Sequence, residues 1–248
     1  MSVHDLPQNR PRATTLPGRH VSAATLTGTR PTVVLAPHPD DESLGCGALL
    51  AHAFADRGAH VICVSDGAAS HPGSQDWPPQ RLSCLRRQEL EQAIVHLGGW
   101  PTDLTWLGLS DSRLYLSDRV AVARSIAEIC RTLGAHRLFA PAEEDHHADH
   151  KVTADIARRV LAFCPGLRLY SYPVWSRWDD PNFARTIARH RPFLLRTAPA
   201  HARKRAAIQA HASQLGQRVF DDPDGFTIAP GFVEKFLTED EIFWRIRA

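Results

Sequence analysis

One short stretch of the chain concentrates groups that can bind a metal ion or move protons. Residues 37–42 read PHPDDE, which places one imidazole and three carboxylates within five residues. A catalytic zinc site usually takes three protein ligands from His, Asp and Glu and leaves a fourth position for water. The side chains of Asp40 and Asp41 should diverge because the residues are adjacent, so one can bind a metal while the other acts as a general base.

A second polar cluster follows about a hundred residues later. Residues 143–150 read EEDHHADH and contain three histidines. His38, Asp41 and His150 can together supply a three-ligand metal set, with Asp40 facing the bound water as general base. Because His150 comes from a separate loop, such a site forms only when the chain folds.

Each cluster also has a purely structural interpretation. An Asp-Asp-Glu run at the start of a helix can cap free N–H groups and oppose the helix dipole. A histidine-rich loop can be no more than a solvated surface. The functional interpretation is favoured because both clusters are expected at matched strand ends.

The segments around the two clusters predict strands that alternate with helices. Residues 32–36 form a short apolar run bounded by prolines, which predicts a buried strand, and residues 44–57 predict a helix that ends before Gly58. Further strands are expected at 60–64, 104–107, 137–140 and 167–172, and further helices at 81–97, 117–133, 151–163 and 202–215. The helix at 117–133 would be capped by Ser117.

This alternation predicts an α/β fold: a Rossmann-like, mostly parallel sheet with helices on both faces. In the C-terminal third we expect short antiparallel edge strands at 185–187 and 193–196, followed by mixed helix and loop over 232–246. Residues 1–30 are expected to be a loosely ordered lead-in, and residues 31–248 a single domain. Both polar clusters then lie at the carboxyl ends of strands, where open α/β sheets bind ligands.

Composition narrows the class of protein. The chain has 248 residues, of which 43% are hydrophobic and 23% charged, as in ordinary globular proteins. A net charge of +2 predicts neither nucleic acid nor an anionic membrane as a partner, and no apolar run is long enough for a membrane span. The five cysteines are dispersed and odd in number, and no signal peptide is expected, so we expect a reducing, cytoplasmic location.

The two motifs together resemble the PIG-L/LmbE-like family of zinc-dependent de-N-acetylases. The resemblance rests on PHPDDE at 37–42 and HADH at 147–150, and extends from about residue 32 to residue 216. It implies that His38, Asp41 and His150 bind zinc and that Asp40 is the general base and later the acid. It also implies that His147 is an electrophilic or proton-donating histidine positioned by Asp149.

The same resemblance suggests residues that contact the substrate. Arg86 and Asp111 resemble family positions that contact the sugar, although Arg86 could instead pair with Glu89 on an exposed helix face. Asp66 could bind a sugar hydroxyl or simply turn the loop before Gly67. The aromatic residues Trp175 and Trp178 could form a wall for a sugar or acyl chain, or belong to the core.

Two positions depart from the family pattern. Ala148 replaces a proline that is frequent in the family, which should change the stiffness of the loop but removes no ligand. Asp145 stands where some members have a tyrosine that assists the oxyanion. A carboxylate cannot donate a hydrogen bond to an oxyanion unless it is protonated, so the sequence identifies no oxyanion donor at this position.

The resemblance implies a hydrolase that removes an acetyl group from an N-acetylated amino sugar or glycoconjugate, a small-molecule substrate. Zinc is the expected cofactor, and Fe²⁺ is an alternative because a His₂-carboxylate set accepts several metals. Two other functions stay open: a metal-dependent amidase or esterase on a non-sugar substrate, and a non-catalytic sugar-binding relic. The sequence pattern predicts no oligomeric state.

Overall fold

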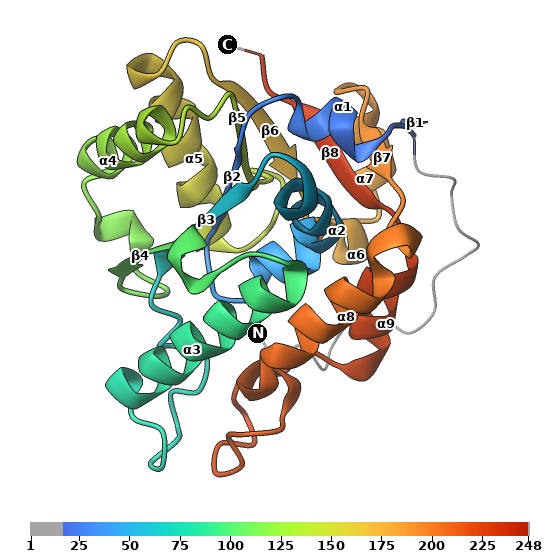
Figure 1. Cartoon of the computed structure of the whole chain (residues 1–248). Coiled ribbons are helices and arrows are strands. Elements are labelled where there is room, and N and C mark those ends of the chain that lie inside the picture. Colours follow the sequence, from blue (N-terminus) through green and yellow to red (C-terminus); the bar gives the residue numbers. More distant parts are fainter. Residues whose placement is uncertain (1–16, 248) are drawn as a thin grey trace.

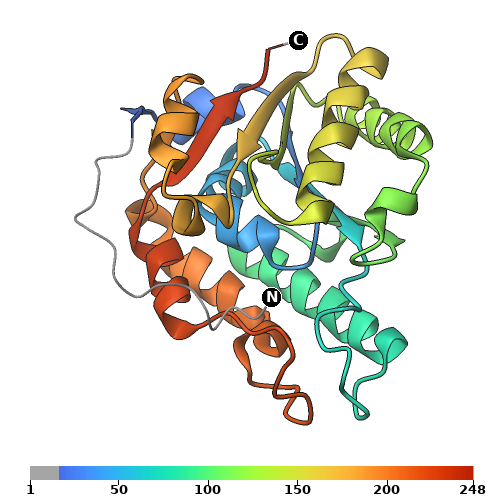
Figure 2. The ribbon, with the colours of Figure 1, turned by 180° about the vertical axis from the view of Figure 1, so that it is seen from behind.

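The computed structural model describes residues 17–247, which form a sheet with helices packed on both faces (Figures 1 and 2). The sheet has eight strands in the order β1-β7-β8-β6-β5-β2-β3-β4. The strands are β1 (Arg19–His20), β2 (Thr32–Ala36), β3 (Ala59–Ser65), β4 (Leu104–Leu109), β5 (Arg137–Pro141), β6 (Arg168–Tyr172), β7 (Phe193–Leu195) and β8 (Glu241–Arg245).

An α-helix is present at each segment that the sequence predicted to be helical, and further short helices accompany them. They are α1 (Ala23–Thr27), α2 (Asp41–Asp56), α3 (Pro79–Leu97), α4 (Arg119–Thr132), α5 (Ala148–Phe163), α6 (Ser176–Asp179), α7 (Phe183–Ala188), α8 (His201–Ala210) and α9 (Pro230–Thr238). Four short 3₁₀ helices are η2 (Pro101–Asp103), η3 (Leu114–Leu116), η4 (Ala198–Ala200) and η5 (Ala212–Leu215). In the described residues no helix has the length and apolar character needed to cross a membrane.

Alternate residues of the central strands serve two separate cores, because successive strand side chains point to opposite faces. Val34 and Ala36 of β2 pack in the core under α2, α3 and α8, whereas Val33 and Leu35 pack in the core under α4 and α5. All four side chains are fully buried. The two-sided, mostly parallel α/β architecture predicted from the sequence is thereby confirmed.

The sheet reverses its strand order between β2 and β5. The chain runs from β2 to β3 and β4 on one side, and then returns to place β5 on the other side of β2, with all these pairs parallel. Ligand sites in open α/β sheets form at such a switch point, outside the carboxyl ends of the strands. The loops that follow β2 and β5 carry the two polar clusters, so both clusters lie at this point.

The C-terminal third differs from the sequence prediction in two places. Residues 185–187 were predicted as a strand and lie in α7, where Phe183 and Ile187, four residues apart, bury one helical face. The tail contains the unpredicted strand β8, whose buried residues alternate between two cores. Strand β8 pairs antiparallel with both β6 and β7, so the expected antiparallel pairing is confirmed, although β8 lies inside the sheet.

Two helix boundaries also differ. Helix α4 is capped by Asp118 rather than by Ser117, because the Asp118 carboxylate accepts the N–H groups of Val120 and Ala121, each at 3.0 Å. The helix predicted over 202–215 ends at Ala210, and η5 follows it.

Part of the expected lead-in is structured. The prediction for residues 1–16 lies outside the described residues. Arg19 donates its backbone N–H to Pro192 at 3.1 Å, and Leu26 of α1 is completely buried. Residues 19–27 are therefore an integral part of the fold rather than a loose lead-in.

Helix α2, which begins at the first polar cluster, is fixed to the C-terminal elements by a buried carboxylate. Glu241 of β8 accepts hydrogen bonds from the N–H groups of Ala48 and Leu49 at 2.6 and 2.9 Å. The same carboxylate forms an ion pair with Lys204 of α8 at 2.7 Å. Both charged side chains are 1% exposed. These contacts hold the middle of α2 against β8 and α8.

We expect Lys204→Met to lower the free energy of unfolding by about 3–5 kcal/mol, because it leaves the buried Glu241 charge without its partner. Urea unfolding followed by circular dichroism measures the change. Lys151→Met, on the exposed surface of α5, is the matched control and should stay within about 0.5 kcal/mol of the wild type. An unchanged stability of Lys204→Met would mean that the ion pair does not secure α2.

Candidate active site

The three predicted metal ligands meet around one carboxylate oxygen. His38 follows β2, Asp41 begins α2, and His150 lies in the first turn of α5. Asp41 Oδ2 lies 3.2 Å from His38 Nδ1 and 3.2 Å from His150 Nε2, and it accepts the backbone N–H of His38 at 3.0 Å. The structure thus brings together residues that are more than a hundred positions apart.

The charge balance of this cluster favours a positive charge at its centre. Burial acts to lower the pKa of His38, but hydrogen bonds to three surrounding carboxylates raise it well above its usual value. Burial also opposes protonation of His150, yet Asp41 and Asp145 raise its pKa to about 9. Although burial alone would raise the pKa of Asp41, the two histidines hold it well below the usual range. A divalent cation would satisfy the same electrostatic demand.

The donor atoms also fit a metal ion. His150 Nε2 is buried and, among the described residues, has no partner of hydrogen-bond geometry; the carboxylate oxygen 3.2 Å away, Asp41 Oδ2, is itself an atom of the ligand type. Imidazole and carboxylate groups are the usual ligands of catalytic zinc. Ligand atoms within 4.8 Å of one another come from two overlapping sets: His38, His147 and His150, and His38, Asp111 and Asp149.

Asp145 orients His150, a role that the sequence analysis missed. Its Oδ2 lies 2.9 Å from His150 Nδ1, and the side chain is fully buried. The carboxylate also accepts the N–H groups of Val174, Trp175 and Ser176 and the Ser176 hydroxyl, at 2.6 to 3.2 Å. A carboxylate on the outer nitrogen of a histidine ligand is a recurrent feature of metal sites. Asp145 therefore fixes the orientation of the His150 ring.

Asp40 is held in a strained conformation next to the ligands. Its backbone has φ +140° and ψ −31°, which a non-glycine residue adopts only when its surroundings enforce it. The side chain makes no helix cap and instead lies 3.3 Å from Arg86 Nη2. Burial raises the pKa of Asp40 to about 7, although Arg86 opposes the shift. Asp40 and Asp41 thus have different partners, as their divergence predicted.

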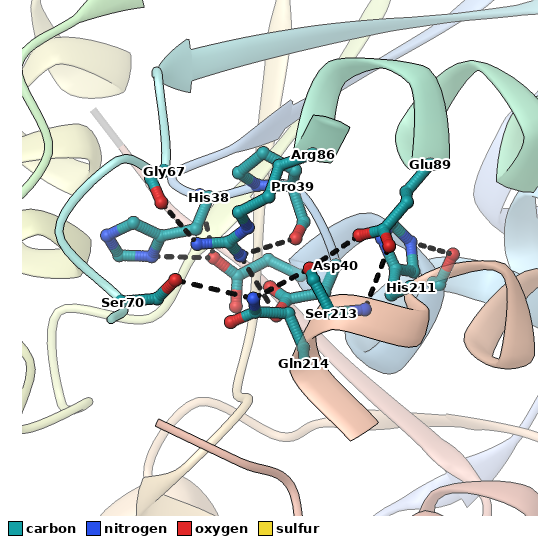
Figure 3. Close-up of polar contacts among 12 residues, drawn as sticks. His38, Pro39, Asp40, Gly67, Ser70, Arg86, Glu89, His211, Ser213 and Gln214 are labelled. Carbon is teal, nitrogen blue, oxygen red and sulfur yellow. Dashed lines mark hydrogen bonds and ion pairs between the residues drawn. The ribbon is translucent and has the colours of Figure 1, made fainter. Parts of the chain in front are cut away.

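Arg86 contacts the backbone of two loops and the side chain of Asp40, and not its predicted helix partner Glu89 (Figure 3). Its two terminal nitrogens donate to the backbone oxygens of Gly67 at 2.9 Å and Pro39 at 2.7 Å, as well as contacting Asp40. The side chain is 3% exposed, and no ion pair joins it to Glu89 among the described residues. The alternative pairing with Glu89 is wrong, and the observed contacts hold Asp40 in place.

Glu42 fixes the backbone of the same turn. Its Oε2 accepts the N–H of Asp40 at 3.0 Å, while Oε1 accepts the Ser43 hydroxyl at 2.5 Å and contacts His211 Nε2 at 3.0 Å. Burial acts to lower the pKa of His211, but the carboxylate of Glu42 raises it. The buried Glu42–His211 pair ties the PHPDDE turn to the C-terminal part of the chain.

His147 is held as a neutral imidazole. Its Nδ1 accepts the backbone N–H of Asp149 at 3.2 Å, so the ring proton lies on Nε2. Burial lowers the pKa of His147 to about 4, and the neighbouring His38 and His150 act in the same direction. Asp149 therefore contacts His147 through its backbone N–H and not through its carboxylate. The Asp149 carboxylate lies 3.4 Å from His38 Nε2 and accepts the N–H of Ser112 at 2.7 Å.

The two predicted substrate-binding aspartates have different environments. Asp111 Oδ1 lies 3.2 Å from His38 Nε2, and its other oxygen accepts the N–H of Ala69 at 2.9 Å. Although burial would raise the pKa of Asp111, His38 holds it well below the usual range. Asp66 accepts the N–H groups of Ala68 and Asp111 at 3.0 and 3.1 Å, which fits the loop-turning interpretation.

A cavity of about 170 Å³ opens over these groups. Trp175 lines it and packs edge to face against Phe226, with ring centroids 5.9 Å apart, so one of the two predicted wall tryptophans is in place. Both tryptophans also pack edge to face against the core residue Phe236, and Trp178 is not among the residues that line the cavity. Five lining residues that folding brings to the cavity were given no site role from the sequence: Ala69, Ser70, Ser112, Gln214 and Phe226.

Comparison with known proteins supports the same picture. The family model described as PIG-L, GlcNAc-PI de-N-acetylase, matches residues 33–161, just over half of the chain. A 2'-N-acetylparomamine deacetylase of Streptomyces fradiae is 31% identical over 173 residues, which cover 63% of this chain but only 62% of that protein.

Solved structures share the fold at low sequence identity. An N,N'-diacetylchitobiose deacetylase from Pyrococcus horikoshii superposes with a TM-score of 0.68 at 19% identity, covering 90% of this chain and 86% of that one. A zinc-inhibited form of teicoplanin deacetylase Orf2 gives 0.62 at 18% identity, covering 88% and 98%. At these identities the likeness establishes the fold alone.

We expect Asp145→Asn to weaken Zn²⁺ binding by about 10–100-fold, because His150 loses the carboxylate that fixes its orientation. Competition with a chromophoric chelator measures the affinity. Glu143→Gln, an exposed change in the same loop, is the control and should bind like the wild type. If the two variants bind Zn²⁺ equally well, Asp145 does not support a metal ligand.

Proposed function

Because the chain belongs to the PIG-L family of de-N-acetylases, we propose that it is a metal-dependent hydrolase that removes the acetyl group from an N-acetylated amino sugar or glycoconjugate. One observation carries the proposal: His38, Asp41 and the fully buried His150 form a His-Asp-His donor set, and His38 and Asp41 line one cavity together with Asp40, a buried carboxyl group with a pKa near 7. The similarity to a 2'-N-acetylparomamine deacetylase supports an amino-sugar substrate.

His38, Asp41 and His150 would hold the metal ion. Zn²⁺ suits two imidazoles and a carboxylate, and Fe²⁺ is possible on the same donors. When bound, the ion would polarise the acetyl carbonyl and lower the pKa of a water molecule from 15.7 towards about 7. Asp145 and Asp149 contact His150 and His38 from outside and keep their rings oriented.

Asp40 is the proposed general base. It takes a proton from water as the water oxygen attacks the acetyl carbonyl carbon, and a pKa near 7 suits a group that must accept and then release a proton. The C–N bond then breaks, and the amine nitrogen receives the proton as acetate leaves. Arg86 and Glu42 hold Asp40 in position through both steps.

His147 is the proposed donor to the developing oxyanion. Because it is a neutral imidazole with its proton on Nε2, it can donate a hydrogen bond without carrying a charge. One well-placed donor of this kind typically contributes about 3 kcal/mol to transition-state stabilisation.

A panel of N-acetylated amino sugars tests the proposed reaction. We expect the purified protein to release acetate from at least one of them, to lose that activity with a chelator, and to regain it with Zn²⁺. An amidase or esterase would instead cleave acylated non-sugar substrates only, and a relic would cleave neither class. Either result would overturn the sugar assignment.

Asp40→Asn separates catalysis from metal binding. We expect kcat to fall by about 10²–10⁴-fold, because the proton acceptor is removed, while stoichiometric Zn²⁺ binding is retained. Metal analysis and acetate release, measured on the same sample, check both expectations. Asp180→Asn, in the loop between α6 and α7, is the control that should leave kcat unchanged. Wild-type turnover by Asp40→Asn would remove Asp40 from the mechanism.

We also propose that the protein acts in a reducing compartment such as the cytoplasm. None of the five cysteines is paired, and Cys46, Cys63 and Cys130 are buried. Free thiols in this pattern are typical of proteins that fold under reducing conditions.

A further inference from the structure

One buried amide in the cavity wall has no role in the chemistry described so far. Gln214 lies in η5, beyond the residues that the family model matches, and its side chain is completely buried while lining the cavity. Its backbone is fixed on both sides: the N–H donates to His211 at 2.9 Å, and the carbonyl accepts the N–H of Ile228 at 2.7 Å. Only the orientation of the terminal amide is free.

The neighbouring hydroxyl group decides that orientation. Ser213 donates its hydroxyl proton to Glu89 Oε2 at 2.6 Å and its backbone N–H to Glu89 Oε1 at 2.8 Å. Because the single hydroxyl proton is used in this way, Ser213 Oγ can only accept from Gln214, and it does so at 2.9 Å from Nε2. The amide nitrogen of Gln214 therefore faces Ser213, and its oxygen must face away.

The second amide proton has a partner as well. Gln214 Nε2 also donates to Ser70 Oγ at 3.4 Å, and Ser70 Oγ in turn lies 3.0 Å from His71 Nδ1. Figure 3 shows the amide nitrogen of Gln214 between Ser70 and Ser213, with the oxygen on the other side. Both donor positions are thus filled. Gln214 Oε1 is buried and accepts from no group in residues 17–247.

We propose that Gln214 Oε1 accepts a hydrogen bond from a ring hydroxyl of the sugar substrate, which makes Gln214 a specificity-determining residue. This inference rests on the proposed function and names one contact within it. A buried acceptor without a donor is costly, so a ligand that supplies the donor is strongly preferred over an analogue that lacks it.

A ring hydroxyl is a suitable donor because an amino sugar carries several hydroxyl groups, and each can donate one hydrogen bond to an amide oxygen. The hydrogen bond from Ser213 to Glu89 fixes the Ser213 hydroxyl, which in turn fixes the Gln214 amide nitrogen. Gln214 Oε1 is therefore oriented before the substrate enters. Ser213 and Glu89 act as positioning residues, whereas Gln214 itself touches the substrate.

Gln214→Met tests the contact, since methionine has a similar length but cannot accept this hydrogen bond as an amide does. The assay measures acetate release from the best-hydrolysed N-acetyl sugar and from its monodeoxy analogues. For the parent sugar we expect kcat/KM to fall about tenfold, mainly through KM. With the wild type, the analogue that lacks the hydroxyl bound by Gln214 should show the same tenfold loss as the variant shows with the parent sugar. Because this analogue cannot make the contact, the wild type and Gln214→Met should hydrolyse it equally well, and no other analogue should behave in this way.

Several outcomes would overturn the inference. Equal losses for the parent sugar and every analogue would show a merely structural role, and wild-type kinetics of Gln214→Met would show no role. If Gln214→Met fails to fold by circular dichroism, Gln214→Asn, which keeps the amide but shortens its reach, must give the same analogue-specific loss. Gln209→Met on the exposed face of α8 is the control and should match the wild type.

The failure of this inference differs from failure of the proposed function. A wild-type protein that hydrolyses sugars but shows no analogue-specific coupling to Gln214 leaves the deacetylase function intact and removes the contact. A wild-type protein that releases no acetate from any sugar contradicts the proposed function, and the hydroxyl contact with it.

Discussion

The backbone conformation of Asp40 is the constraint on which the site depends. A φ of +140° in a residue with a side chain directs Asp40 and Asp41 to different partners at the start of one helix. Glu42 fixes the N–H of Asp40, and Arg86 fixes the carbonyl of Pro39 just before it. Both supports are buried side chains. The strain is thus maintained by the packed interior and not by the loop itself.

Buried negative charge is the second constraint. Four carboxylates, from Asp41, Asp111, Asp145 and Asp149, lie within hydrogen-bonding range of His38 or His150. So many acids in a buried space are unfavourable unless positive charge is present with them. The raised pKa values of His38 and His150 show that these carboxylates favour protonated, positively charged rings, and a divalent ion would supply more positive charge than one proton. The carboxylates therefore select for a cation.

Local patterns predicted the parts of the site that are local in sequence. Strand β2 and the turn into α2 were predicted because apolar β-branched residues, prolines and the PHPDDE run are contiguous. The contact between His38 and His150 was also predictable, since strand ends of a parallel sheet share one edge. The orienting role of Asp145 was not predicted although His150 is only five residues away, because the carboxylate is held in place by the N–H groups of Val174 and Ser176, about 30 residues away and across a strand.

Other errors had the same physical origin. Arg86 lies on a helix, so a partner three residues away was a natural expectation, yet its contact with Asp40 spans 46 positions. Residues 242–244 are all apolar, so no alternation marks them as a strand, and only the folded sheet shows that they alternate between two cores. Gln214 lies within the stretch that resembles the family, but it was given no site role, because an amide in a polar segment is ordinary until folding buries it.

The Glu241 contact has a consequence for the order in which the molecule is assembled. Helix α2 carries the start of the metal site, but Ala48 receives its carboxylate partner from a residue 193 positions later. Contacts of such long range form late, because closing the intervening loop is slow and entropically unfavourable. During synthesis, the first half of the site can leave the ribosome long before β8 exists to hold it. Competence for metal binding should therefore be acquired in the last stage of folding.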